Sequence, residues 1–378
     1  MPGIYIHIPF CKQACHYCNF HFSTSLRYKN EFLSALLKEI ERVEDIVQPV
    51  QTIYFGGGTP SLLETEELST IMTALKSRFG WQPDAEITLE ANPDDITAPK
   101  LNNWKELGIN RLSIGVQSFF EEDLRWMNRA HNATQAIHSL EMAVKEFSNI
   151  TLDLIYGSPG LTDEKWKQNL DTAIGLGITH LSCYALTVEP KTPLDKRIRQ
   201  QQSPDIDSAQ QSRQFLYLME YMAQNGFEHY EISNFAKPGH RSRHNSSYWK
   251  GENYIGLGPG AHSYDGQSRW WNVANNNQYI REITEGKLPQ EKENLTLSQR
   301  WNEYIMIHLR TMEGINFNEL TTLFSNEKEV FENKWIDHLL RETAPHIKAG
   351  HLVQDDHRIY LTNEGKLFAD GIAGDLFQ

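Results

Sequence analysis

The sequence of 378 residues has no long hydrophobic run. No stretch approaches the about 18–20 consecutive apolar residues that a membrane-spanning helix needs. The first residues also lack the apolar core of a secretory signal, because Lys12 and several cysteines interrupt them. These absences predict a protein of the cytoplasm, and they leave peripheral contact with a membrane open.

Cysteine and positive charge are both scarce. Only four cysteines are present, three of them close together, which disfavours a disulfide scaffold and indicates a reducing compartment. Lys and Arg number 36 against 49 Asp and Glu, giving a net charge of −13 that disfavours a nucleic-acid partner. With 39% hydrophobic and 22% charged residues and no evident repeat, the composition is typical of a globular protein.

The first half of the chain alternates between short apolar runs and amphipathic segments. The runs, closed by Gly, Pro or Asn, predict strands at Gly3–Ile8, Thr52–Phe55, Glu86–Ala91, Arg111–Val116, Thr151–Ile155 and His180–Ala185. Apolar residues at helical spacing predict helices over Asn30–Val47, Glu64–Phe79, Ala98–Leu107, Ala133–Phe147 and Asp163–Leu176. Six β-α units in a row predict an α/β fold with a parallel sheet, which we expect to form a partial (β/α)6 barrel.

The alternation stops near residue 205, where a long helix is predicted over Ser208–Asn225. The last segment begins near Ser298 and predicts three helices, two short strands around Asp355 and a closing helix, a pattern that resembles a winged-helix module. We therefore expect a core domain over residues 1–235, a connecting region over 236–297 and a winged-helix-like domain over 298–378. Because acidic residues surround the last module, a structural or protein-contact role is favoured over DNA binding.

Three cysteines, Cys11, Cys15 and Cys18, follow the first predicted strand in a C-x3-C-x2-C pattern. This spacing is too tight for disulfides among the three and is one ligand short of a closed zinc site, unless His16 or His21 supplies a fourth. It suits an iron–sulfur cluster in which the protein holds three irons and leaves the fourth open to another ligand. The open iron indicates a site of chemistry as well as of electron transfer.

Further candidate residues lie where predicted strands end. The glycines of Gly56–Pro60 follow the second strand, and in a barrel they would lie beside the cysteine loop. Glu90 ends the third strand, where its carboxylate would hold a ligand ammonium or hydroxyl group or would cap the next helix. Gln117 ends the fourth strand and Asp153 interrupts an apolar one, so each must line a cavity or have a polar partner.

Two residues in this half have simpler interpretations. Arg129 lies in a loop, where an exposed position would explain it, and Cys183 lies in an apolar strand, which predicts packing in the core.

A second group of residues lies at Arg241–Trp249, followed by the glycine-rich Tyr254–His262. An imidazole among aromatic residues, here His244, could ligate a haem iron, and nearby arginines could pair with the propionates. A hydrogen-bonded core histidine explains the same residue equally well.

Several motifs occur in an order that resembles a known family. They are the cysteine stretch, Gly56–Pro60, Thr88–Pro93, Ser113–Ser118, Leu154–Gly160 and the His-Asn-Ser-Ser-Tyr-Trp sequence of 244–249. Together they resemble radical S-adenosylmethionine proteins of the oxygen-independent coproporphyrinogen III oxidase group, over nearly the whole chain. The resemblance implies a 4Fe-4S cluster on the three cysteines, with S-adenosylmethionine chelating the fourth iron. Reduction, by an electron donor that the sequence does not identify, then gives methionine and a 5′-deoxyadenosyl radical.

The resemblance also implies the residues that contact S-adenosylmethionine. They are Tyr5, Tyr17, Gly57, Gly58, Thr59, Glu90, Gln117, Arg129, Asp153 and Ala185. Most of them lie at the strand ends that the barrel pattern selects.

Two departures place the sequence within this group. The oxidases carry a further cysteine where this chain has Phe20, and they have a longer segment before the cysteines. Both features resemble the HemW branch, which implies a haem chaperone that passes haem to acceptor haemoproteins, respiratory or membrane-associated ones among them. His244 is then the candidate haem contact. The alternatives are oxidative decarboxylation of coproporphyrinogen III to protoporphyrinogen IX, and a redox or metal-sensing regulator.

Overall fold

A computed structural model describes residues 2–43, 49–327, 330 and 334–378. Six strands form the central sheet, namely β1 (Gly3–Ile8), β2 (Val50–Gly57), β3 (Trp81–Ala91), β4 (Arg111–Gln117), β5 (Ile150–Tyr156) and β6 (His180–Ala185). The helices that connect them are α1 (Lys29–Arg42), α2 (Thr65–Phe79), α3 (Ala98–Glu106), α4 (Glu121–Trp126), α5 (Ala133–Glu146) and α6 (Asp163–Gly175). All six predicted strands and five predicted helices are confirmed, although residues 44–47 of the first predicted helix lie outside the described residues.

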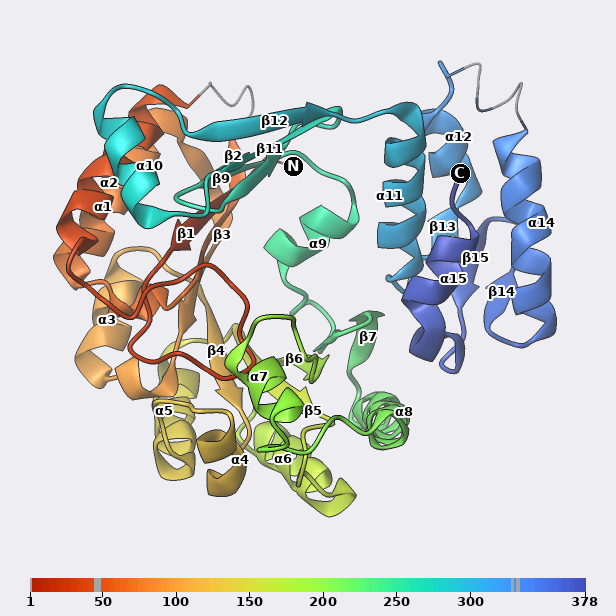
Figure 1. The fold of residues 1–378 in the computed structure, drawn as a ribbon, viewed down its shortest axis with the longest axis horizontal. Coiled ribbons are helices and arrows are strands. Elements are labelled where there is room, and N and C mark those ends of the chain that lie inside the picture. Colours follow the sequence, from red (N-terminus) through yellow and green to blue (C-terminus); the bar gives the residue numbers. More distant parts are fainter. Residues whose placement is uncertain (1, 44–48, 328–329, 331–333) are drawn as a thin grey trace.

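The six strands are parallel, adjacent in chain order and curved, and their connecting helices cover one face (Figure 1). Residues on that face are apolar and buried, as Ile4, Ile6 and Ile8 of β1 show with no exposed area. Residues that alternate with them point to the concave face and are largely polar. The predicted partial (β/α)6 barrel is therefore confirmed. Polar side chains line its concave interior, so the strands do not form a second hydrophobic core there.

Strands from the second half of the chain widen the sheet at both edges. At one edge β9 (Tyr254–Leu257) pairs in parallel with β1, and β10 (His262–Tyr264), β11 (Ser268–Asn272) and β12 (Gln290–Asn294) continue the sheet. At the other edge β8 (Asn234–Ala236) pairs antiparallel with β6 and with β7 (Glu228–Glu231). Helix α8 (Ser208–Gln224) precedes β7. Within the described residues the sheet therefore has twelve strands, of which the sequence predicted six.

The C-terminal segment forms a separate lobe with its own hydrophobic core (Figure 1). It comprises α11 (Leu297–Leu309), α12 (Phe317–Leu323), α14 (Trp335–Lys348) and α15 (Ala369–Asp375), with a three-stranded sheet of β13 (Ile315–Asn316), β15 (Arg358–Leu361) and β14 (Leu352–Gln354). The order of helices and strands is that predicted for a winged-helix-like module. The proposed boundaries at residues 235 and 297 stay a prediction.

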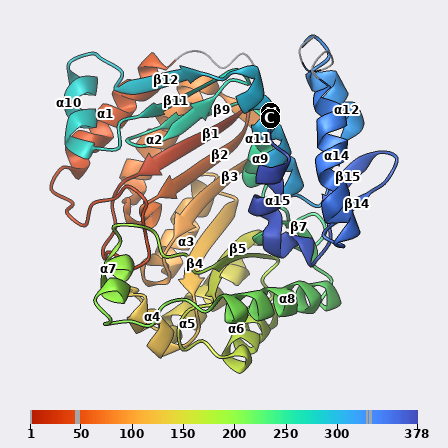
Figure 2. The same cartoon turned by 45° about the vertical axis from the view of Figure 1, so that its right-hand side comes forward.

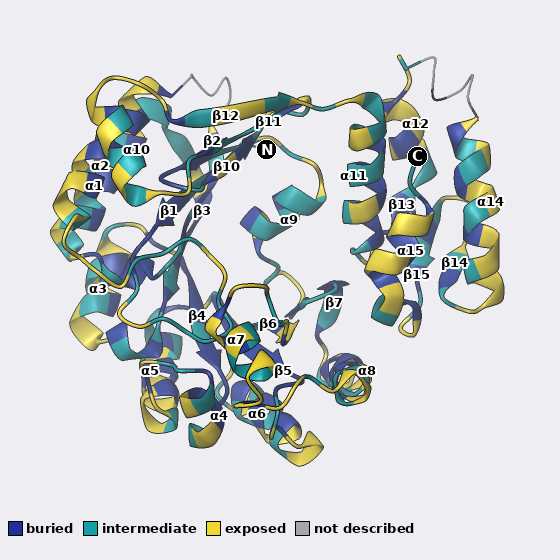
Figure 3. Ribbon diagram, in the orientation of Figure 1, coloured by how far each residue is buried: buried dark blue, intermediate teal, exposed yellow. Residues whose placement is uncertain are grey.

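Helix α9 (Arg243–Trp249) lies inside the concave face, between the sheet and the C-terminal lobe (Figures 1 and 2). Coloured by burial, the strands beside it are mostly dark blue, whereas exposed residues gather on the outer helices (Figure 3). Helix α9 contacts Thr52, near the start of β2, and Glu86, the residue of β3 that pairs with Thr52, so it closes the barrel at the end opposite to the cysteine loop. The fold therefore has an open end that carries the cysteines and a closed end that carries α9.

No helix among the described residues combines the length and apolar character required to cross a bilayer.

Candidate functional site

The cysteine loop follows β1 directly and is held at its base by its own backbone. Ser23 donates its N–H to Pro9 O at 2.9 Å, and Cys11 donates to Ser23 O at 3.0 Å. None of the three cysteines forms a disulfide, and each is partly exposed. Burial raises the pKa of the Cys11 thiol to about 11, so its thiolate needs a positive partner such as iron.

The far side of the loop is held by residues of the helices and turns that follow the strands of the barrel. His16 donates its N–H to Met127 O at 3.0 Å, and its own carbonyl accepts from Leu194 N at 2.8 Å. Lys12 forms ion pairs with Asp94, at 2.8 Å, and with Asp95. The loop therefore spans the mouth of the barrel and is anchored at both sides, which fixes the positions of the three thiols.

Arg129 is the residue that links the cysteine loop to the strand ends. Its Nη1 lies 3.2 Å from Cys15 Sγ, and its Nη2 donates to Asn92 Oδ1 at 2.8 Å and to Gly115 O at 2.6 Å. The exposed-loop interpretation of Arg129 is therefore wrong. Arg129 therefore places a positive charge directly against the cysteine loop.

Two glycines let the turn after β2 approach the cysteine loop. Gly58 donates its N–H to Ile8 O at 2.8 Å, and a Cβ there would lie 2.6 Å from Phe10 O. Gly57 has φ of 106°, and a Cβ there would meet the ring of His7 at 2.6 Å. The predicted position of the glycine turn beside the cysteine loop is confirmed, and Thr59 follows it as a buried residue.

A carboxylate and two tyrosines line the interior next to this turn. Glu90 accepts a hydrogen bond from Tyr54 Oη at 2.8 Å and one from Gly57 N at 3.2 Å. Tyr5 stacks on Tyr54 with ring centroids 6.1 Å apart. Burial raises the pKa of Glu90 to about 8, so the carboxyl carries a proton at neutral pH until a cation approaches it. Glu90 is thus a wall of the cavity and does not cap a helix.

Asp153 faces the same interior from β5, where side chains of neighbouring strands hydrogen-bond to it. Burial raises its pKa to about 7, an effect that hydrogen bonds from Ser182 and Ser113 oppose. Gln117 ends β4 at a bulge with φ of 74°, a left-handed conformation that costs a non-glycine residue about 1–3 kcal/mol. Strain of this kind is concentrated at ligand sites.

The remaining predicted contacts lie at the far side of the opening. Tyr17 packs against a small apolar cluster that includes Ile155 and Leu194. Ala185 is exposed at the end of β6. The structure thus brings the predicted residues to one end of the barrel, while their role as contacts of S-adenosylmethionine stays a prediction. Cys183, as predicted, is buried in the core and faces away.

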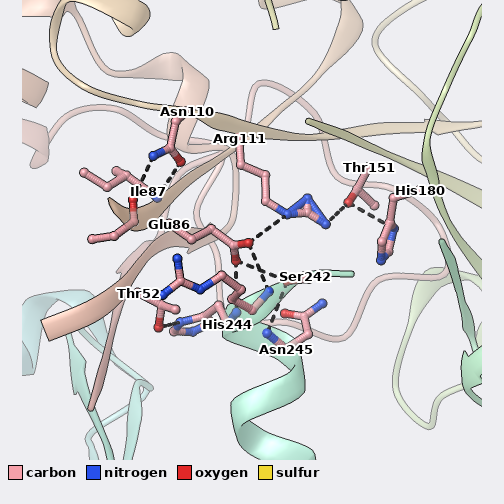
Figure 4. Close-up of polar contacts among 12 residues, drawn as sticks. Thr52, Glu86, Ile87, Asn110, Arg111, Thr151, His180, Ser242, His244 and Asn245 are labelled. Atoms are coloured by element: carbon pink, nitrogen blue, oxygen red, sulfur yellow. Dashed lines mark hydrogen bonds and ion pairs between the residues drawn. The ribbon is translucent and has the colours of Figure 1, made fainter. Parts of the chain in front are cut away.

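His244 lies at the other end of the barrel, on α9, and is 1% exposed. Its Nδ1 is 2.8 Å from Thr52 Oγ1 (Figure 4). Its Nε2 is 2.8 Å from Tyr248 Oη, so both ring nitrogens have hydrogen-bond partners. The ring also stacks on Tyr54 at 5.0 Å, and burial lowers its pKa to about 3. This conformation gives His244 the environment of a structural core histidine and presents no free nitrogen to a haem iron.

Glu86 and Arg111, which the sequence did not single out, hold α9 in this place (Figure 4). The Glu86 carboxylate accepts from Arg243 N at 3.0 Å and from His244 N at 2.9 Å, at the first turn of α9. The Glu86 carboxylate also lies 3.6 Å from Nε of the buried Arg111. The guanidinium of Arg111 in turn donates a hydrogen bond to the Thr151 hydroxyl. Successive side chains of a strand point to opposite faces, and this alternation directs both Glu86 and Arg111 into the barrel. Charged residues at inward-facing positions of predicted strands are the signal that could have identified them.

The donor set at the open end fits a multi-iron cluster. No group of three or more His, Cys, Asp or Glu side chains within the described ranges converges on the position of a single metal ion. A four-iron cluster needs three thiolates, each bound to a different iron. Cys11, Cys15 and Cys18 form no disulfide and can supply these ligands, and the sulfur of Cys15 lies against the guanidinium of Arg129.

Comparison with known proteins gives relatives over the full chain. Residues 5–173 match the model of the radical SAM superfamily. The heme chaperone HemW of Bacillus subtilis is 35% identical over 99% of this chain and 98% of its own length. The proteins of the same name from Mycobacterium tuberculosis and Escherichia coli are 34% and 31% identical, each over 98% of this chain and over 93% and 96% of their own lengths. Among solved structures, coproporphyrinogen III oxidase (HemN) from Escherichia coli superposes with a TM-score of 0.85, covering 100% of this chain and 90% of that one at 24% identity.

Proposed function

Because the chain belongs to the HemW family of radical SAM proteins, we propose that it is a haem chaperone, which binds haem and transfers it to acceptor haemoproteins. The observation that carries this proposal is the similarity to heme chaperones from several bacteria, which extends through the C-terminal lobe as well as the barrel. Phe20, at the position where the related oxidases have a further cysteine, is 67% exposed and supports the same choice.

The cofactors of the proposed function are a 4Fe-4S cluster and S-adenosylmethionine. Cys11, Cys15 and Cys18 would hold the cluster, and the residues at the strand ends would surround S-adenosylmethionine. When bound and reduced, this pair supplies a carbon-centred radical, chemistry that belongs to the cofactor and that the protein positions and shields.

The chain's own contribution at this end is electrostatic. Arg129 places positive charge against Cys15 Sγ, and the carboxyls of Glu90 and Asp153, with pKa values of about 8 and about 7, face the same interior. A ligand that carries an ammonium or sulfonium group would favour the ionised carboxylates and release protons as it binds. This arrangement fits the charge distribution of S-adenosylmethionine.

The alternative function is the oxidative decarboxylation of coproporphyrinogen III. The relationship with coproporphyrinogen III oxidase is one of fold, at 24% identity. An anaerobic assay with reductant, S-adenosylmethionine and coproporphyrinogen III separates the two, and a vinyl product would overturn the chaperone proposal as the main function.

A transfer experiment tests the chaperone proposal directly. The purified protein is loaded with one equivalent of haem and mixed with a haem-free acceptor, and the acceptor's Soret spectrum is followed. We expect transfer to be faster than from haem held on serum albumin at the same concentration. Equal rates from both donors would contradict a chaperone function.

Two further parts of the proposal concern partners and place. We propose that the acceptors include respiratory haemoproteins at a membrane, and that the protein works in the cytoplasm. Comparing transfer to haem-depleted membranes with transfer to a soluble apoprotein tests the first part. Preference for the soluble acceptor would refute it.

A further inference from the structure

A cleft of about 680 Å³ lies beside α9, between Thr52 of β2 and the C-terminal lobe. Its walls come from α9, from α11 and α12, from the segment around Tyr230 and from Thr52 of β2. Three carboxyl side chains, those of Glu252, Glu313 and Glu319, also line it. This volume lies within the range of about 300–1,000 Å³ that cofactor and ligand sites occupy in proteins.

Helix α9 divides its side chains between two environments. His244 and Tyr248, four residues apart, point into the barrel, where they hydrogen-bond to each other. Residues at the i, i+3, i+4 and i+7 positions, which are Arg243, Ser246, Ser247 and Lys250, line the cleft instead. The helix therefore presents small hydroxyl side chains at the middle of the cleft and a cation at each end.

The two cations are available to an anionic ligand. Arg243 is 41% exposed, and its Nη1 donates to Asp84 O at 2.7 Å. The same Nη1 lies 3.5 Å from the Asp84 carboxylate, itself 79% exposed, a surface ion pair that contributes little free energy and leaves Nη2 and Nε for a ligand. Lys250 is exposed and forms no ion pair with another described residue. Seven residues along a helix separate the two by about 10 Å. Arg241, also in the cleft wall, is already paired with Glu228 and Glu313.

On the opposite wall, His308 of α11 is 6% exposed and has the hydrogen-bonding arrangement of a metal ligand. Its Nδ1 lies 2.9 Å from Tyr304 O, and since a carbonyl only accepts, Nδ1 carries the hydrogen. Burial lowers the pKa of His308, so the neutral ring keeps a lone pair on Nε2. A histidine whose Nδ1–H is fixed by a backbone carbonyl is the usual form of an imidazole that binds iron through Nε2.

The surroundings of Nε2 are also those of a cation site. The Glu319 carboxylate lies 3.6 Å from His308 Nε2, beyond hydrogen-bonding distance, and is 53% exposed. Trp249, whose indole N–H has no hydrogen-bond partner among the described residues, lines the cleft nearby with Tyr230. Arg310 lies over the ring of Trp249 and Arg241 over the ring of Tyr230, so the remaining parts of the two rings face the cleft. An imidazole lone pair, aromatic side walls and two separated cations match the iron, the macrocycle and the two propionates of haem.

We propose that this cleft is the haem site, with His308 Nε2 as the axial ligand and Arg243 and Lys250 as the propionate partners. The proposal rests on the proposed haem-chaperone function and gives that function a place. It assigns the HNSSYW segment a double role, in which His244 and Tyr248 fix α9 in the barrel while Arg243, Ser246, Ser247 and Lys250 present the helix to haem.

The test is a titration of the purified full-length protein with haem, followed by its Soret band. His308→Asn keeps a side-chain donor for Tyr304 O and removes Nε2, so we expect affinity at least about tenfold weaker and loss of the nitrogen-ligated spectrum. The control is His357→Asn, at an exposed histidine of the same lobe, which should bind as the wild type does. Unchanged affinity and spectrum in His308→Asn, or equal weakening in the control, would overturn the assignment of the ligand.

A second pair of measurements tests the propionate partners. Arg243→Gln with Lys250→Gln should weaken binding of haem about tenfold but leave binding of haem dimethyl ester unchanged, because the ester has no carboxylates. Iron-free protoporphyrin IX should respond to this double substitution and not to His308→Asn. If the wild-type protein binds no haem at all, the chaperone function itself fails. If the wild-type protein binds haem but the variants and the modified porphyrins show none of these differences, the chaperone function stands and only the assignment of haem to this cleft is overturned.

Discussion

Replacement of Glu86 tests whether a buried ion pair holds α9 in the barrel. Glu86 and Arg111 have side chains that are 4% and 2% exposed, and they are 3.6 Å apart. Removing one partner of a buried pair leaves an uncompensated charge and costs about 3–5 kcal/mol. We therefore expect Glu86→Ala to lower the free energy of unfolding by about 4 kcal/mol. The value of about 4 kcal/mol includes the cost of leaving the N–H groups of Arg243 and His244 without their acceptor.

The double variant separates charge from packing. In Glu86→Ala with Arg111→Met the uncompensated guanidinium is gone, so the remaining cost is the lost cap of α9, about 1 kcal/mol, and the cavity left by the shorter side chain. The double variant should thus be more stable than Glu86→Ala alone, with a coupling energy of about 2 kcal/mol. Glu106→Ala, at an exposed position of α3, is the matched control.

Two measurements follow the effect. Urea unfolding monitored by tryptophan fluorescence gives the change in midpoint, and amide hydrogen exchange of residues 242–249 reports local opening of α9. Faster exchange in this segment is expected for Glu86→Ala and for the double variant, and not for the control. Additive effects of the two single substitutions, or α9 exchange that Glu86→Ala leaves unchanged, would refute the argument.

Three other predictions concern the open end of the barrel. Replacing Cys11, Cys15 or Cys18 with Ala should abolish the broad iron–sulfur absorbance after reconstitution, whereas Cys183→Ala, at a buried core position, should retain it. Arg129→Gln should lower the reduction potential of the reconstituted cluster, because a positive charge against Cys15 Sγ favours the more negative, reduced state; a potential equal to that of the wild type in a redox titration would contradict this. In the cofactor-free protein the pKa of Glu90 is raised from 4.5 to about 8, so the folded state binds more protons than the unfolded state in this interval and stability falls as pH rises, by at most about 1.4 kcal/mol per unit. Glu90→Gln should remove this part of the pH dependence in urea unfolding between pH 5 and pH 8, and an unchanged slope would show that another group causes it.

The strands and helices of the first half were predictable because each signal is local. A strand such as Ile150–Tyr156 is a short apolar run bounded by turn residues and is buried on both faces. Such a run can be recognised from its own sequence, without knowing which strands it pairs with. The strands of 236–297 carry no such signal. Gln290–Asn294 contains only polar and charged residues, since it is an edge strand, and Tyr254–Leu257 becomes a strand by pairing with β1, about 250 residues earlier in the chain.

The same distinction applies to the site. The cysteines and Glu90 were predictable because they occupy ends of strands, where parallel sheets gather their functional residues. The state of His244 was not, because its partner Thr52 lies 192 residues away and its burial depends on how α9 enters the barrel. The sequence motif correctly marks this helix, whereas the direction in which each of its side chains points depends on the tertiary fold.

The positions of the two ends have a consequence for how the protein works. Thr52, against α9, and Gly57, beside the cysteine loop, are five residues apart on β2, which is about 17 Å along a strand. No side chain of the haem cleft is a candidate contact of the cluster or of S-adenosylmethionine. We therefore expect haem binding and cluster assembly to be separable by substitution. The cysteine variants should still bind haem, and His308→Asn should still assemble the cluster; if either substitution abolished both properties in a folded protein, haem and cluster would share one site and the cleft would not be the place of haem.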